Sequence, residues 1–212
     1  LDPGGRERDR SVGRWGVTVL AMAGFILVGL MGGSAGDQTP TSLIQVRGFY
    51  LEAVHEESAI ERGMAAIESA RAAAYAQGEG LEDLDETEAT VLRAYEGALI
   101  TLRAKHGVWP PARLRHLRDG LEILDESVAA APYHAEVRYL RLLSAYFLPG
   151  ILGRGQSVRE DLAALAELLP AAAGSYPPDL YRTMVRFVLQ NGELEPPQRA
   201  ALEAVIPSEA DV

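Results

Sequence analysis

Residues 88–132 read EATVLRAYEGALITLRAKHGVWPPARLRHLRDGLEILDESVAAAP, and two helical patterns follow each other in them. The first has apolar residues three or four positions apart, as on one helix face: Val91, Leu92, Tyr95, Leu99 and Leu102. Gly107 ends this pattern, and Pro110 and Pro111 stand where proline is tolerated, at a helix entry. The second pattern carries Leu114, Leu117, Leu121, Leu124 and Val128. We therefore predict helices over 88–106 and 111–131, joined by a short connection.

The rest of the chain after Pro40 carries similar patterns and no sustained alternation typical of strands. Ser58 with Glu61 and Ser157 with Glu160 have the spacing of capping boxes, which predicts helix starts there. Further helices are expected over 42–55, 59–77, 134–148, 157–169, 178–190 and 197–206. The predicted fold class is all-α.

The predicted helices fall into consecutive pairs, which cover 42–77, 88–131, 134–169 and 178–206. Tyr50 and Tyr95 lie 45 residues apart, at similar points in the first helices of two pairs. Small residues follow each tyrosine (Ala53; Gly97 and Ala98) and would let the paired helix approach closely. This pattern predicts a tetratricopeptide-like stack of about four antiparallel helical hairpins. A compact helical bundle is the alternative.

Composition excludes several kinds of protein. The chain has 212 residues, a formal net charge of −10 and no cysteine. The missing cysteines exclude thiol catalysis, disulfides and cysteine-based zinc sites. A surface this acidic repels phosphate backbones, so no nucleic-acid partner is expected.

The N-terminal residues have the pattern of an export signal. A polar segment with four arginines is followed by the uncharged run VTVLAMAGFILVGLM at 17–31 and by GGSAG at 32–36. We predict that 1–36 is a signal peptide or an N-terminal membrane anchor and that 37–212 is a helical-repeat domain. The protein is then exported and is periplasmic or secreted, or it is held in the inner membrane by residues 17–33.

Motifs for catalysis, metals or cofactors are not evident. The four histidines (55, 106, 116 and 134) form no HExxH motif, and GILGRGQS at 150–157 lacks the end of a phosphate loop. His106 and His116 could meet across the hairpin; we interpret His106 instead as a residue that favours the end of its helix electrostatically. The acidic segment 78–86 is interpreted as a solvated connector. No catalytic residue, metal or cofactor is expected.

Residues 88–162 carry a more specific set of short motifs. These are Ala94-Tyr95 with Gly97-Ala98, Ala104-Lys105-His106, Ala131-Pro132, Val137-Arg138 with Leu140-Arg141, and Pro149, Gly153 and Glu160-Asp161. With these motifs the chain resembles a family of exported bacterial proteins related to tetratricopeptide repeats. The resemblance implies a tetratricopeptide-like helical fold and points to no activity.

The candidate structural or partner-contact residues come from these motifs: Tyr95, Lys105, His106, Arg138, Arg141, Arg154, Glu160 and Asp161. Arg138 and Arg141 share a helix face, and acidic groups suit the start of the next helix, so we predict an Arg–carboxylate pair between them.

Two functions are considered for such a chain. The first is a non-catalytic scaffold that binds an envelope protein or peptide. The alternative is a periplasmic protein that binds a small ligand or assists transport, with a pocket lined by Trp109, Tyr139, Tyr146 and Phe147.

Overall fold

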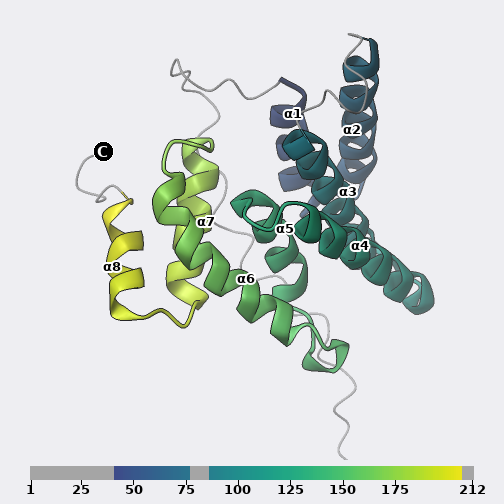
Figure 1. Ribbon diagram of the computed structural model, residues 1–212. Helices are drawn as coiled ribbons and strands as arrows, with labels where there is room; N and C mark the ends of the chain where they lie inside the picture. Colours follow the sequence, from purple (N-terminus) through teal and green to yellow (C-terminus); the bar gives the residue numbers. More distant parts are fainter. Residues whose placement is uncertain (1–40, 77–85, 207–212) are drawn as a thin grey trace, which may run out of the picture. The chain divides into compact units, whose positions relative to one another are not determined.

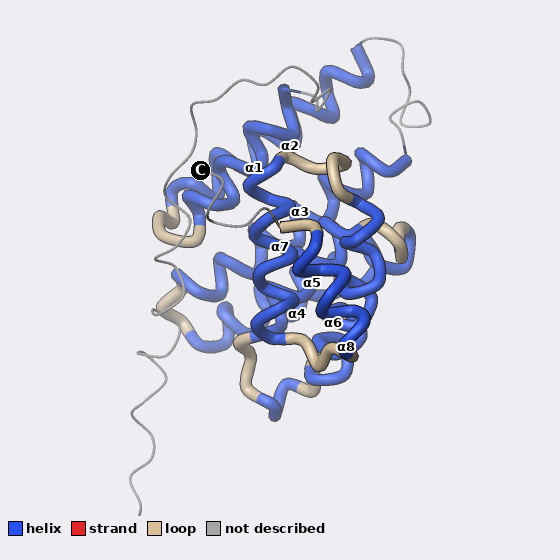
Figure 2. Tube along the Cα trace, turned by 90° about the vertical axis from the view of Figure 1, so that its left-hand side faces the viewer, coloured by secondary structure: helices blue, strands red, loops and turns tan. Residues whose placement is uncertain are grey.

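The computed structural model describes residues 41–76 and 86–206, in which every regular element is helical (Figures 1 and 2). The predicted signal or anchor at 1–36 lies outside the described residues, as does almost all of the acidic connector at 78–86. Within the described part, none of the helices combines the length and the apolar character needed to span a membrane. The predicted all-α class is confirmed.

Residues 41–76 and 86–206 contain eight α-helices and two short 3₁₀ helices. They are α1 (Thr41–Ala53), α2 (Ser58–Ala76), α3 (Glu86–His106), α4 (Pro110–Ala130), α5 (Ala135–Tyr146), η3 (Gly150–Leu152), α6 (Gly155–Leu168), η4 (Leu169–Ala172), α7 (Pro178–Asn191) and α8 (Pro196–Ala204). Helices that were predicted to pair do contact each other, as α1–α2, α3–α4, α5–α6 and α7–α8.

The start of α6 differs from the predicted capping box. The helix begins at Gly155, its N-cap residue is Arg154, and no side chain caps it. The Ser157 hydroxyl donates to the Arg154 carbonyl, and Glu160 accepts from Gln156 instead. The physical reason is the turn before the helix, where Gly153 takes a left-handed φ of 70° and lets the backbone enter the helix two residues early.

Ser58 and Glu61 stand at the start of α2 as predicted, but their side chains have other partners. The Ser58 hydroxyl donates to Glu56, and Glu61 pairs with Arg103 of α3. A capping box does form at α8, where Glu195 and Gln198 satisfy each other's backbone N–H groups.

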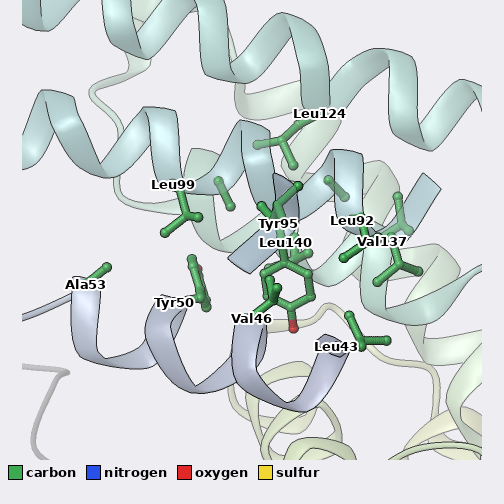
Figure 3. Packing of buried hydrophobic residues seen from close by; sticks show 14 of the residues in the cluster. Leu43, Val46, Tyr50, Ala53, Leu92, Tyr95, Leu99, Leu124, Val137 and Leu140 are labelled. Atoms are coloured by element: carbon green, nitrogen blue, oxygen red, sulfur yellow. The ribbon is translucent and has the colours of Figure 1, made fainter. Parts of the chain in front are cut away.

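The first of two hydrophobic clusters is built by α1 to α5. Apolar side chains along α1, from Leu43 to Ala53, face Leu92, Tyr95 and Leu99 of α3 (Figure 3). The rings of Tyr50 and Tyr95, which the sequence placed at similar points of two hairpins, meet edge to face with centroids 5.5 Å apart. Aromatic pairs of this geometry stabilise a core beyond the area that they bury.

The α3–α4 hairpin is held together by a contact between two glycines. A Cβ atom on Gly97 would lie 2.9 Å from the carbonyl oxygen of Gly120, and one on Gly120 would lie 2.6 Å from that of Gly97. The two backbones therefore touch at this crossing. This confirms that small residues after Tyr95 allow a close approach of the paired helix.

Helix α5 is shared by both hydrophobic clusters. Val137 and Leu140 belong to the first cluster, whereas Tyr139 and Leu142 pack into the second with residues of α6, α7 and α8. Because opposite faces of α5 are buried, this helix joins the two clusters. It also carries Glu136 and Arg141, two of the buried polar side chains described next.

Candidate functional site

The predicted pairing of α5 with α6 centres on Asp161, which is fully buried. Arg141 holds this carboxylate with two parallel hydrogen bonds, from Nε to Oδ2 and from Nη2 to Oδ1, both 2.8 Å long. Arg138 Nη1 lies 2.9 Å from the same Oδ1. The predicted Arg–carboxylate pair is confirmed, and charge-assisted bidentate bonds of this kind are among the strong ones.

The network extends from α5 to α4 through Asp125. This carboxylate accepts from Arg141 Nη1 at 3.2 Å and from Arg154 Nη1 at 2.5 Å. Burial lowers the pKa of Arg141, but the bonds to Asp161 and Asp125 outweigh it and raise the pKa overall. Asp125 was missed by the sequence analysis. Its position one turn after Leu121, an inward residue, was the available signal.

A second buried polar cluster joins α1, α3 and α5. Glu136, which is 1% exposed, accepts two hydrogen bonds from Arg47, 2.8 and 2.7 Å long. The hydroxyl of Tyr95 donates to the same carboxylate at 2.6 Å. Burial, and then the charge of Glu136, raises the pKa of Tyr95 well above its ordinary value. Tyr95 is thus a structural residue of this cluster, in which the sequence analysis missed Arg47 and Glu136.

Lys105 and His106 lie at a third place, the end of α1. The ammonium of Lys105 donates to the carbonyl of Val54, and His106 Nε2 lies 2.8 Å from the carbonyl oxygen of Ala53. Carbonyls at the end of a helix have no partner within that helix. Lys105 and His106 provide partners for such carbonyls at the end of α1. His106 was expected to stabilise the end of its own helix, α3, and in the structure its ring bonds the end of α1.

Metal binding finds no support in the described ranges. No group of three or more His, Cys, Asp or Glu side chains is placed there so that it could hold a metal ion.

A groove of about 580 Å³ runs between α4 and α6, with α5 beneath it. It is lined by Asp125, Val128, Ala129, Pro132, Arg138, Arg141, Glu160, Ala163, Ala164 and Glu167. Three of the eight candidate residues thus line the groove, namely Arg138, Arg141 and Glu160. Beside the groove, Asp161 binds the guanidinium group of Arg141, and Arg154 binds the carboxylate of Asp125.

The aromatic side chains of the alternative function do not line this groove. Tyr139 and Tyr146 each meet the ring of Phe187 edge to face, with centroids 5.8 and 5.1 Å apart, and Phe147 meets Tyr146 edge to face as well. Trp109 lies elsewhere, at the start of α4, where it is largely exposed. Tyr139, Tyr146 and Phe147 thus form one aromatic group with Phe187 of α7 and do not surround the groove.

Comparison with known proteins gives no family for this chain. No protein-family model matches it, and neither a curated protein nor a solved structure is significantly similar.

Proposed function

We propose that this chain is an exported helical-repeat scaffold that binds a basic peptide segment of an envelope protein in the α4–α6 groove, without catalysis. The observation that carries this proposal is the groove itself, whose walls carry short apolar side chains and whose exposed charges are acidic. The α3–α4 and α5–α6 pairs flank it, as consecutive hairpins of a tetratricopeptide-like stack would. Export is proposed from the signal pattern of residues 1–36.

The charges of the groove favour a basic ligand. Arg138 and Arg141 line it, but both guanidinium groups are bound to the buried Asp161. Glu160 and Glu167 are exposed on α6. They are seven residues apart, so they lie on one helix face with about 10 Å between them along the axis. These carboxylates suit two lysine or arginine side chains of an incoming peptide.

The walls of the groove favour a close approach of a peptide. Val128 and Ala129 of α4 face Ala163 and Ala164 of α6 across it. Short side chains leave room for a peptide backbone or a small apolar residue between the two helices. The ion pairs of α5 beneath them fix the spacing of the walls, because Arg141 reaches Asp125 on α4 and Asp161 on α6.

The proposal is tested with a labelled ten-residue peptide that has lysines at both ends of an Ala-Leu segment. We expect fluorescence anisotropy to show saturable binding by the full chain. The double substitution Glu160→Lys/Glu167→Lys should weaken it by about tenfold or more, because like charges replace opposite ones. A peptide with glutamates in place of the lysines should not bind.

The matched control is Glu193→Lys/Glu203→Lys, which changes the net charge equally at exposed positions near and on α8. This control should bind the lysine peptide nearly as the parent chain does. If both double variants weaken binding equally, the peptide responds to net charge only, and the groove is not its site.

A further inference from the structure

The tip of the α3–α4 hairpin is basic in an otherwise acidic chain. Between Glu96 and Asp119 there is no acidic residue, whereas five lysines or arginines occur: Arg103, Lys105, Arg113, Arg115 and Arg118. The whole chain carries a net charge of −10. The positive charge is therefore concentrated where α3 ends and α4 begins.

Large apolar side chains are exposed at the same tip. Val108 is 93% exposed, Trp109 is 70% exposed, and Leu114 of α4 is 58% exposed. Pro110 and Pro111 start α4 directly after the indole, with Trp109 as the N-cap residue in an extended conformation. The prolines fix the connection, so its apolar side chains are presented to solvent by a stiff turn.

Part of the positive charge remains available at this tip. Arg103 is paired with Glu61, and Arg113 Nε donates to the carbonyl of Ala104. Arg115 and Arg118 of α4 are exposed, and Arg118 has only a 3.6 Å contact with the neighbouring Asp119.

The turn between α1 and α2, which contacts the end of α3, does contain carboxylates. Glu52 in the last turn of α1 and Glu56 in the connection share one partner, Arg62, which neutralises part of their charge. Glu57 adds a further exposed carboxylate there. These carboxylates pair with Arg62 and not with Arg115 or Arg118, so the two arginines of α4 keep their attraction for an external anion.

We propose that this tip docks reversibly on an anionic lipid surface. Tryptophan favours the boundary between headgroups and hydrocarbon, and arginines next to it attract acidic headgroups. An acidic protein partner is the competing occupant, but three apolar side chains fall short of the roughly 800 Å² per partner of a stable protein interface. A lipid surface accepts such a small group by shallow insertion. This inference is independent of the proposed peptide groove.

The test uses the full chain with Trp15→Phe, which leaves Trp109 as its single indole. Emission is recorded with phosphatidylcholine vesicles that contain or lack phosphatidylglycerol. We expect a blue shift of Trp109 emission with the anionic vesicles only. Adding Arg115→Glu/Arg118→Glu should lower the apparent partition coefficient at least about tenfold, since each basic residue near the surface contributes to binding.

Residues 17–33 are present in every variant, so a difference between variants reports on the tip. The control Arg159→Glu/Arg199→Glu changes the charge equally at exposed sites on α6 and α8 and should retain the shift. A shift that is independent of lipid charge, or that survives Arg115→Glu/Arg118→Glu, overturns the proposal. The proposal is also overturned if Trp109 emission is unchanged by anionic vesicles and shifts only with polyglutamate. That result would indicate an acidic protein partner.

Discussion

Glu136 and Asp161 are buried carboxylates, and each is held by two donor side chains. Arg47 and Tyr95 bind the first, and Arg138 and Arg141 bind the second. A buried ion pair is costly to desolvate, but it is costlier to break, because the remaining charge has lost its partner. These clusters therefore fix how α5 lies against α1, α3, α4 and α6 more than they raise the total stability.

The ion pair of Arg141 can be tested by truncation. We expect Arg141→Ala to lower the free energy of unfolding by about 3–5 kcal/mol, because Asp161 stays buried with one donor fewer. Urea denaturation followed by circular dichroism measures this change. Arg93→Ala is the matched control, since Arg93 and Glu126 form an exposed pair on α3 and α4 whose loss should change little. Equal midpoints for Arg141→Ala and the parent chain would contradict the structural role.

How far the site could be predicted depended in part on the distance between partners along the chain, although Asp125 was missed only 16 residues from Arg141. Asp161 follows Arg138 by 23 residues and Arg141 by 20, on the next α-helix. Helical spacing and a helix start were therefore enough to pair them. Glu136 and Arg47 are separated by 89 positions. No local pattern brings such residues together, because their contact depends on how α1 packs against α5.

Among the helices, the crossing of α3 and α4 depends on Gly97 and Gly120. We expect Gly97→Ala and Gly120→Ala each to destabilise the protein by about 1–3 kcal/mol, because the new methyl group meets the backbone of the other helix. Thermal unfolding of the purified variants measures the effect.

Gly48→Ala provides the control for these two variants. Gly48 lies inside α1, and a Cβ there meets nothing within 4 Å. Alanine is a better helix former than glycine, so this variant should gain about 0.5–1 kcal/mol. If Gly97→Ala were as stabilising as Gly48→Ala, the close approach of α3 and α4 would be wrong.

Helix boundaries were predictable where a proline or a glycine stands at the end. Gly107 follows α3, and Pro110, Pro178 and Pro196 each begin a helix in the structure. The start of α6 was predicted two residues late, since Ser157 and Glu160 have the right spacing but lie inside the helix. Spacing alone could not show that the helix begins at Gly155, directly after the turn at Gly153.

Across the whole described unit, α5 is the helix whose buried side chains belong to both hydrophobic clusters, and Val158 of α6 also packs against both. The buried side chains of α5 alternate between them, with Leu140 in the first and Leu142 in the second. A defect in one cluster therefore disturbs a helix that the other also needs. The sequence could not reveal this, because a helix buried on two faces shows no single apolar stripe.

This link predicts that the two clusters unfold together. Leu142 is fully buried in the second cluster, so Leu142→Ala should cost about 2–5 kcal/mol. Hydrogen exchange measured by mass spectrometry should then show the slowest amides of α3 losing as much protection as those of α7, although Leu142 belongs to a different cluster from α3. Leu51→Ala, at an exposed position of α1, should leave both helices nearly unchanged. A loss of protection confined to α6, α7 and α8 would mean that α5 does not couple the clusters, and that the C-terminal helices open on their own.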